Sequence, residues 1–244
     1  MRVPLVIVTG FLGAGKTTLI NRLLARRKAR GETRKLGVIV NELGAIGIDG
    51  SLLAGDAARQ IELPGGCVCC VLGDELDKTL IELVDRNPDL EAIVLETTGV
   101  AEPLPIAWAA ARAGVNERVR LAAVVTLVDA THFIASRPVS VAVDAQVAYA
   151  DVLLVTKTEL AGKLESAAAI EIARQLAPKA EVRVGTTEAH AEWLEEVLAD
   201  PELEHVHGHE HAHDHEHVDV DSVAIEIAGD VDVEELEDQL AQLP

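Results

Sequence analysis

The chain has 244 residues, of which 49% are hydrophobic and only 2% aromatic, and its formal net charge is −20 at pH 7. This length allows one large α/β domain with a small appendage, and its core has to be built from Val, Leu, Ile and Ala. The negative charge argues against a general nucleic-acid or anionic-membrane binder, because both need a basic face. We therefore expect neither nucleic acid nor a membrane as a partner.

All three cysteines lie between residues 67 and 70. An odd number of cysteines in one cluster is not a disulfide framework, and it indicates a metal or redox site in a reducing compartment. The amino-terminus leads straight into a strand pattern without the apolar region of a signal peptide, and no apolar run has the length of a membrane span. We expect a cytoplasmic protein.

Strand and helix patterns alternate along the first 200 residues. Short apolar runs predict strands, at residues 3–9, 36–41, 60–63, 92–96, 119–129, 152–156 and 181–184. Apolar residues at helical spacing predict helices, at residues 16–30, 74–84, 163–176 and 190–198. This alternation predicts an α/β fold with a doubly wound, mostly parallel sheet.

The composition changes sharply after residue 200. Residues 201–221 are rich in His, Glu and Asp and predict a flexible linker. Residues 222–227 alternate like an edge strand, and residues 231–243 are spaced like an amphipathic helix. One strand and one helix cannot bury a core alone. Residues 222–244 therefore dock on the main domain, pair with another chain, or begin a small C-terminal α+β domain that is cut short.

A glycine-rich loop between the first strand and the first helix matches the full phosphate-binding pattern, Gly10-x-x-x-x-Gly15-Lys16-Thr17. Glycines let backbone N–H groups converge on phosphates, and the start of the helix adds its positive end. Lys16 places a cation on the β- and γ-phosphates, and Thr17 offers a hydroxyl to Mg²⁺. Residues 1–200 are thus predicted to be a P-loop nucleoside triphosphatase. Its loop contacts to nucleotide are Gly10, Gly13, Ala14, Gly15, Lys16, Thr17 and Thr18.

The strand at residues 92–96 ends in Glu96 and continues into Thr97-Thr98-Gly99. An acid at the end of an apolar strand beside the phosphate loop can hold the Mg²⁺ shell, usually through water. Gly99 allows the backbone to approach the γ-phosphate. Together with Lys16 and Thr17, Glu96 is predicted to be catalytic.

Residues 156–159 stand where GTPases usually carry Asn-Lys-x-Asp. There the Asp carboxylate accepts two hydrogen bonds from guanine, and the Lys stem lies along the base. In this chain Thr156 replaces the Asn and Glu159 replaces the Asp, while Lys157 is kept. Glu keeps both acceptor oxygens but places them one methylene further out. The pattern favours GTP over ATP by a reduced margin.

The Cys67-Val68-Cys69-Cys70 motif follows two glycines. In an extended segment Cys67 and Cys69 point to one side, and Cys70 joins them only if the backbone turns. Soft thiolates suit Zn²⁺, Co²⁺ or Cu(I), and an incomplete shell that leaves a position for Glu42, a His or solvent fits transfer better than a structural site. The alternatives are buried cysteines that act as small hydrophobes, or a redox couple.

Seven histidines occupy every second position of the predicted linker: His205, His207, His209, His211, His213, His215 and His217. In a flexible chain any pair of these imidazoles can chelate, so several metal ions would bind weakly and exchange fast. The alternative is a solvated spacer.

Five segments, in this order, resemble the CobW-type metal-chaperone GTPases, relatives of the nickel-insertion GTPases for urease and hydrogenase. They are residues 10–19, 41–49, 65–70, 96–103 and 146–151, the last leading to Lys157. The resemblance implies slow GTP hydrolysis that gates delivery of a transition metal to a client protein. It also implies a switch loop at residues 41–49, with Glu42 and Asp49 as candidate metal contacts, although Ala45 replaces an acid common in the family. The C-terminal piece is shorter than the domain usual in the family.

These features together predict a GTP-hydrolysing metallochaperone for zinc or cobalt. Its cofactors would be GTP or GDP, Mg²⁺ and Zn²⁺ (or Co²⁺), and its partner a client metalloprotein; a homodimer is compatible with the sequence. One alternative is an ATP-using P-loop enzyme such as a small-molecule kinase. The other is a metal buffer whose nucleotide site is vestigial.

Overall fold

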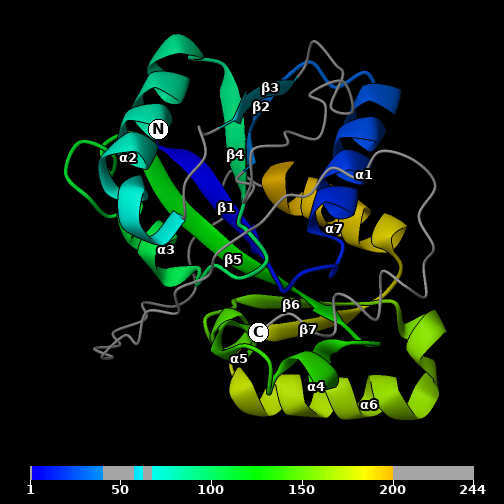
Figure 1. Cartoon of the computed structure of the whole chain (residues 1–244). Coiled ribbons are helices and arrows are strands. Elements are labelled where there is room, and N and C mark those ends of the chain that lie inside the picture. Colours follow the sequence, from blue (N-terminus) through cyan, green and yellow to red (C-terminus); the bar gives the residue numbers. More distant parts are fainter. Residues whose placement is uncertain (1, 41–57, 63–67, 200–244) are drawn as a thin grey trace, which may run out of the picture.

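The structure, a computed structural model, describes residues 2–40, 58–62 and 68–199, and for residues 58–62 and 68–75 it describes the backbone path alone. Within these ranges seven strands form one sheet in the order β3-β2-β4-β1-β5-β6-β7, and all of the paired strands run parallel (Figure 1). The strands are β1 (Val3–Thr9), β2 (Lys35–Val40), β3 (Ala58–Glu62), β4 (Leu90–Glu96), β5 (Val119–Asp129), β6 (Val152–Thr156) and β7 (Glu181–Val184).

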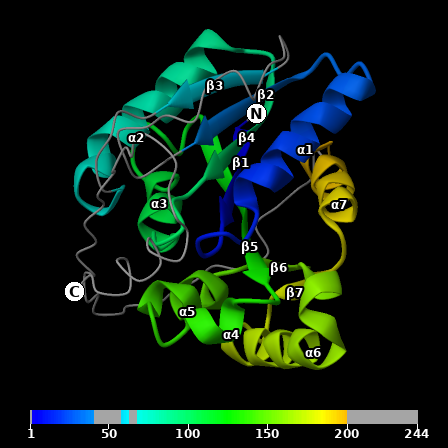
Figure 2. The same ribbon diagram turned by 45° about the vertical axis from the view of Figure 1, so that its right-hand side comes forward.

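Helices cover both faces of this sheet, as Figures 1 and 2 show from two directions. The described helices are α1 (Lys16–Ala29), α2 (Val68–Arg86), α3 (Leu104–Ala109), α4 (Phe133–Ser136), α5 (Val141–Ala148), α6 (Thr158–Leu176) and α7 (Thr187–Ala199). Helices α1 and α7 lie side by side on one face, and the remaining helices cover the other. None of the helices in the described part of the chain is long and apolar enough to span a membrane.

The alternation of side chains along β1 explains the two layers. Val6 and Val8 pack into the cluster that includes the apolar residues of α1 and α7. Leu5 and Ile7 pack into the cluster beneath α2 and α3. Successive side chains of a strand point to opposite faces, so a strand buried on both sides is a continuous apolar run, which is what β1 shows.

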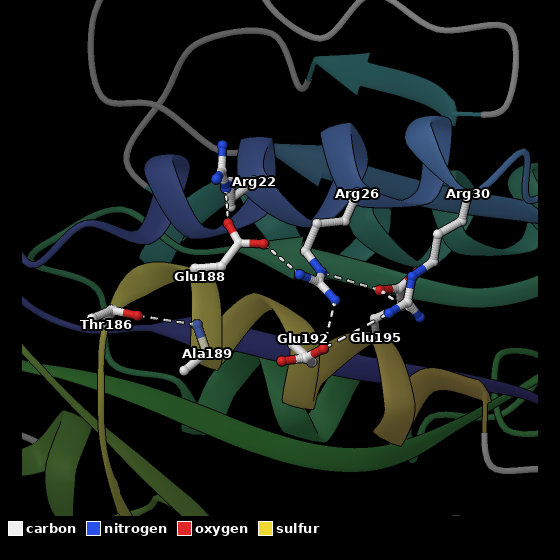
Figure 3. A network of polar contacts seen from close by, with 8 residues as sticks. All are labelled: Arg22, Arg26, Arg30, Thr186, Glu188, Ala189, Glu192 and Glu195. Atoms are coloured by element: carbon white, nitrogen blue, oxygen red, sulfur yellow. Dashed lines mark hydrogen bonds and ion pairs between the residues drawn. The ribbon is translucent and has the colours of Figure 1, made fainter.

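An ion-pair network also joins α7 to α1 (Figure 3). Arg26 of α1 lies at its centre and contacts three carboxylates of α7. The side chains that take part are Arg22, Arg26 and Arg30 on α1, and Glu188, Glu192 and Glu195 on α7. The basic residues recur every four positions and therefore share one face of α1.

The strand order changes direction at β1, which lies between β4 and β5. In open parallel sheets, ligands bind outside the carboxyl ends of the strands at such a switch point. The carboxyl ends that meet at this edge are Thr9 of β1, Glu96 of β4, Asp129 of β5 and Thr156 of β6. The predicted nucleotide residues thus lie where the topology favours a site.

The predicted α/β class and all seven predicted strands are confirmed, with boundaries that agree within two residues. Three predicted helices are longer than expected: α2 begins at Val68, α6 at Thr158 and α7 at Thr187. Near the start of α6, Gly162 is non-helical. Helices α3, α4 and α5 were not predicted, because four to eight residues are too few to show a helical period. The predicted linker, strand and helix after residue 200 lie outside the described residues.

Candidate nucleotide-binding site

The phosphate loop joins β1 to α1, and its glycines have the backbone conformations that the motif requires. Gly10, Gly13 and Gly15 have φ values of 139°, 75° and 98°, in the region that other residues rarely adopt. A Cβ atom on Gly10 would lie 2.6 Å from the carbonyl oxygen of Leu127 in β5. The loop therefore packs directly on the end of the neighbouring strand, which only glycine permits at that position.

Lys16 opens α1 and is 8% exposed. Its ammonium group donates hydrogen bonds to the carbonyl oxygens of Gly10, at 2.8 Å, and Phe11, at 3.3 Å. Burial lowers the pKa of Lys16 below its ordinary value, and the nearby Glu96 carboxylate offsets part of this effect. The loop thus concentrates one positive charge at the amino-terminal end of a 14-residue helix, where anions are favoured.

Thr17 and Glu96 meet across the sheet edge. The Thr17 hydroxyl donates to Glu96 Oε1 at 2.5 Å, and Glu96 is 4% exposed. The parallel register that pairs Val8 with Glu96 places the end of β4 beside the phosphate loop. A hydroxyl and a carboxylate side by side form a hard-oxygen donor set, which is the type that Mg²⁺ prefers. These two residues therefore fit a magnesium ion.

The segment that follows β4 packs closely on the phosphate loop. A Cβ atom on Gly99 would lie 2.8 Å from the Leu12 nitrogen, so the two backbones approach more closely than a side chain would allow. Gln146 of α5 fixes this segment, because its Nε2 donates to the carbonyl oxygens of Gly99 and Ala101, both at 3.0 Å. The sequence alone did not predict a role for Gln146, because Gln146 reaches this segment only when α5 is packed in the folded domain.

Thr156 and Lys157 also contact the phosphate loop. The Thr156 hydroxyl donates to the Ala14 carbonyl at 3.2 Å, and Lys157 Nζ donates to the Gly13 carbonyl at 2.8 Å. Lys157 has a φ of 58°, a left-handed conformation that costs a residue with a side chain about 1–2 kcal/mol. The end of β6 is therefore tied to the phosphate loop by two hydrogen bonds.

Asp129, at the end of β5, is a residue of this site that sequence reasoning missed. Its carboxylate accepts hydrogen bonds from Lys157 Nζ at 2.7 Å and from the Thr131 hydroxyl at 2.5 Å. Burial alone would raise the pKa of Asp129, but the hydrogen bonds from Lys157, Thr131 and His132 hold it at about 2. An acid at the end of an apolar strand was the signal that identified Glu96, and the same signal was present here.

A pocket of about 90 Å³ lies next to the phosphate loop. Its lining residues are Ala14, Gly15, Thr18, Leu19, Leu127, Thr156, Lys157, Thr187 and His190. The structure thus brings Thr18 and Lys157 to one pocket, and adds Thr187 and His190 from the start of α7. Glu159 lies in the first turn of α6 with an exposed side chain, outside this lining.

A larger pocket of about 460 Å³ lies next to α3, with Leu104 and Trp108 in its wall. No residue of the phosphate loop lines it. Its residues are mainly apolar, with Arg2 and Arg120 among them, and it has none of the converging backbone N–H groups of a phosphate loop. The smaller pocket is therefore the one that matches nucleotide chemistry.

Several predicted metal residues lie outside the described residues: Glu42, Asp49, Cys67, His205, His207, His209, His211, His213, His215 and His217. The backbone of Cys69 and Cys70 is described, and it corrects one expectation. Both residues lie in the first turn of α2, so they are not extended. The backbone there is helical, so the alternation expected for an extended segment does not apply to these two residues. Among the side chains that the structure describes, no group of three or more His, Cys, Asp or Glu residues could hold a metal ion.

The fold and this site define a P-loop nucleotide-binding protein, and comparison with known sequences identifies its family. The nucleotide-binding domain of the CobW/HypB/UreG family matches residues 4–184. The chain belongs to this family.

Individual relatives carry metal-chaperone names. The zinc chaperone YjiA of Escherichia coli (strain K12) is 38% identical over 169 residues, which cover 67% of this chain and 52% of that protein. The zinc chaperone CobW of Sinorhizobium sp is 37% identical over 142 residues, which cover 56% of this chain and 39% of that protein. The chain thus spans about half the length, or less, of these curated relatives.

Comparison with solved structures identifies one of the same relatives. The crystal structure of the Zn(II)-bound YjiA GTPase from E. coli matches with a TM-score of 0.57 and 30% sequence identity. The match covers 75% of this chain and 57% of that chain. The similarity therefore extends over most of the domain that carries the phosphate loop.

Proposed function

We propose that this chain hydrolyses GTP and uses the nucleotide cycle to bind a transition-metal ion and deliver it to a client metalloprotein. The observation that carries this proposal is the contact of 2.5 Å between Thr17 and Glu96 beside the buried Lys16. Membership of the CobW/HypB/UreG family supports it, as do relatives named as zinc chaperones and as a GTPase.

In this proposal the phosphate loop binds the triphosphate through the backbone N–H groups of residues 10–18. Lys16 neutralises charge on the β- and γ-phosphates, and Thr17 and Glu96 would hold Mg²⁺, Glu96 through water. The ion would neutralise charge that develops on the phosphate oxygens. Gly99 keeps the segment after β4 close enough for its backbone to approach the γ-phosphate. Burial of Lys16 strengthens its attraction for phosphate, because the local dielectric is low.

Base selection would fall to Lys157 and Glu159. Lys157 lines the pocket next to the phosphate loop, and a flat base there could lie along its methylene stem. Glu159 is exposed, lies two residues further along and is not among the residues that line this pocket. We therefore propose GTP as the preferred nucleotide, with a modest margin over ATP.

The cargo site would be formed by Cys67, Cys69 and Cys70. Their segment follows β3, and the carboxyl end of β3 lies at the same edge of the parallel sheet as Glu96. Neighbouring strands lie about 4.8 Å apart, and β3 is two positions from β4 in the sheet. The carboxyl end of β3, which precedes the cysteines in the chain, therefore lies about 10 Å from the strand that ends in Glu96, and this supports coupling between cargo and nucleotide.

Zinc is the first choice for the cargo because the relatives named above are zinc chaperones, and cobalt is the second. The alternating histidines at residues 205–217 would gather metal and pass it to the cysteines. Three clustered thiols suit a reducing compartment, which we take to be the cytoplasm.

A binding panel tests the proposal. Affinity and turnover of GTP and ATP are measured with Zn²⁺, Co²⁺ and Ni²⁺, and metal affinity is measured in the nucleotide-free, GDP and GTP states. Linkage requires that metal and nucleotide affect each other equally, so we expect zinc affinity to differ between the GDP and GTP states. Identical metal affinity in all three states would make the protein a metal buffer. Turnover of ATP in preference to GTP would favour a kinase-like enzyme.

A further inference from the structure

Asp129 forms an ion pair with Lys157 next to the phosphate loop, and the proposed chemistry gives Asp129 no role. Asp129 is 6% exposed, and its Oδ2 accepts a hydrogen bond from Lys157 Nζ at 2.7 Å. Its Oδ1 accepts from the backbone nitrogen of Thr131 at 2.9 Å and from the Thr131 hydroxyl at 2.5 Å. The carboxylate is therefore fixed in orientation by the turn that follows β5.

The same ammonium group has a second anchor. Lys157 Nζ donates to the Gly13 carbonyl oxygen at 2.8 Å, so the side chain reaches from the end of β6 to the phosphate loop and to β5. A freely rotating lysine would sample many conformations, and these two contacts select one of them. The backbone of Lys157 has a φ of 58°, a value that residues other than glycine rarely adopt.

Lys157 is also one of the residues that line the pocket next to the phosphate loop. Lys157 lines the pocket of about 90 Å³ together with Thr18 of α1 and Thr187 of α7. Lys157 therefore forms part of the wall next to the phosphate loop, and its side chain carries a stem of four methylene groups. An apolar wall of this kind suits the flat face of a nucleotide base.

We propose that Asp129 is the positioning residue for base binding: it holds the Lys157 stem over the phosphate loop so that the base can stack on it. The inference rests on the proposed function, in which a nucleoside triphosphate binds here. Stacking on methylene groups does not read the exocyclic groups of a base. Asp129 therefore strengthens binding of guanine and adenine alike, while Glu159 accounts for the preference between them.

The test is the substitution Asp129→Asn in the full chain, which removes the charge and keeps the size of the side chain. The Kd values of GTP, GDP, ATP and inorganic tripolyphosphate are measured by calorimetry. We expect the three nucleotides to lose affinity by the same factor, about tenfold, which is within the range of coupling between contacting residues. Tripolyphosphate, which has no base, should bind as it does to the parent.

Two variants serve as matched controls. Asp89→Asn makes the same chemical change at an exposed ion pair with Lys35, before β4 and away from the phosphate loop, and should leave all four Kd values unchanged. Lys157→Met keeps an unbranched apolar stem but loses both anchors. It should lower the affinity for the three nucleotides about as much as D129N does. The variant that carries both substitutions should bind them no more weakly than Lys157→Met alone, because both changes break the same interaction.

Each outcome decides the inference. Parent-like GTP affinity in D129N would overturn it, and so would an equal loss of tripolyphosphate affinity, which would mean that Asp129 merely supports the loop. If the D129N chain does not fold, Asp129→Glu carries the test. It shifts the carboxylate by one methylene and should weaken GTP but not tripolyphosphate. A parent chain that binds tripolyphosphate but no nucleotide would instead refute the proposed function itself.

Discussion

The ammonium group of Lys16 is the charge on which phosphate binding depends. It is buried and hydrogen-bonded to Gly10 and Phe11. We predict that Lys16→Ala raises the Kd of GTP by about 100-fold or more, since hydrogen bonds to charged groups contribute about 1.5–3 kcal/mol each. The helical content should stay unchanged, because the lost contacts belong to the loop and not to the core.

The matched control is Lys179→Ala, at an exposed position between α6 and β7. It should bind GTP like the parent. Calorimetry and circular dichroism on both variants check the prediction. GTP turnover by K16A at the parent rate would refute the phosphate-loop assignment.

Glu159 provides a second test at the scale of single residues. A carboxylate placed for two hydrogen bonds to a base commonly separates bases by about 1–3 kcal/mol, and misplacement forfeits part of that. We predict that Glu159→Asp increases the ratio of ATP Kd to GTP Kd, because the shorter stem restores the geometry usual in GTPases. Glu159→Gln, which lacks one acceptor oxygen, is the control and should decrease the ratio. Equal affinity for both nucleotides in all three proteins would exclude guanine recognition by this residue.

The role of a residue could be predicted from the sequence when its partners lie in the same continuous motif. The phosphate loop could be predicted completely, since its glycine conformations and Lys16 belong to one continuous motif. Gln146 could not, because its partner Gly99 lies 47 residues away and is brought near only when α5 packs in place. Asp129 carried the same signal as Glu96, an acid at the end of an apolar strand, but its partner Lys157, 28 residues away, is brought near only by the sheet. The cysteine motif was found by its spacing, but its conformation was not, because Cys69 and Cys70 begin a helix.

At the scale of elements, a network of ion pairs joins helices α1 and α7 (Figure 3). Arg26 contacts three carboxylates, and its side chain is 15% exposed, against 56% for Arg30. We predict that Arg26→Ala lowers the unfolding midpoint by about 2–4 °C, a typical response for a domain of this size. The loss should shrink in 1 M salt, because salt screens charges.

Arg30→Ala, one turn further along α1, is the control for the Arg26 prediction. Exposed ion pairs contribute little, so its midpoint should stay close to that of the parent. Thermal scans at low and high salt measure both variants. A midpoint for R26A that falls equally at both salt concentrations would indicate lost packing and not lost charge.

His190 anchors the start of α7 to the sheet. It is 2% exposed, and its Nε2 lies 3.0 Å from the carbonyl oxygen of Val155 at the end of β6. Burial lowers the pKa of His190, the positive charge of Arg183 adds to this, and the hydrogen bond to Val155 offsets part of it. The folded state therefore binds fewer protons than the unfolded state, so this contribution to stability is complete above a pH of about 6.5 and is lost as the pH falls below it.

We predict that the free energy of unfolding declines between pH 7 and pH 5, by at most about 1.4 kcal/mol per pH unit for one proton. His190→Asn should be less stable at pH 8 and should show a flatter decline. Urea melts at four pH values measure both quantities. A decline of the same slope in the parent and in H190N would assign the pH dependence to other groups.

Element prediction succeeded where patterns were long or fully buried. The strands β1, β5, β6 and β7 have the predicted boundaries, because each is an apolar run or an alternating segment between turns. The start of α2 was missed because Val68–Leu72 follows two glycines and resembles a loop in sequence. Helices α3 and α4 have six and four residues, and tertiary packing, not periodicity, determines such short elements.

At the scale of the whole molecule, the histidine segment at residues 205–217 is tethered to the folded domain. The composition of residues 201–221 predicts a flexible linker, and such a linker would keep a local concentration near about 1 mM. We predict that deleting residues 205–217 lowers the total metal capacity and slows loading when metal is scarce. The high-affinity site and GTP turnover should stay nearly unchanged, because the proposed catalytic residues lie in residues 10–99.

A chain in which residues 205–217 are replaced by Gly and Ser of equal length is the control for linker reach. Metal titration and GTP turnover are measured on the parent, the deletion and the replacement. If the tight site disappears with the histidines, they ligate the metal in that site directly, and the division between gathering and holding is wrong.

The parallel order of the strands has a consequence for synthesis on the ribosome. β1 is made first, but its two neighbours are β4 and β5, and Leu5 pairs with Ile93 and Leu121. Gly10 packs on Leu127, and the pocket next to it takes residues from as late as His190. At about 5–20 residues per second, the nascent chain carries its phosphate-loop motif for many seconds before a nucleotide pocket can close around it. Nucleotide is therefore unable to assist the early stages of folding, and it can stabilise only a domain that is already almost complete.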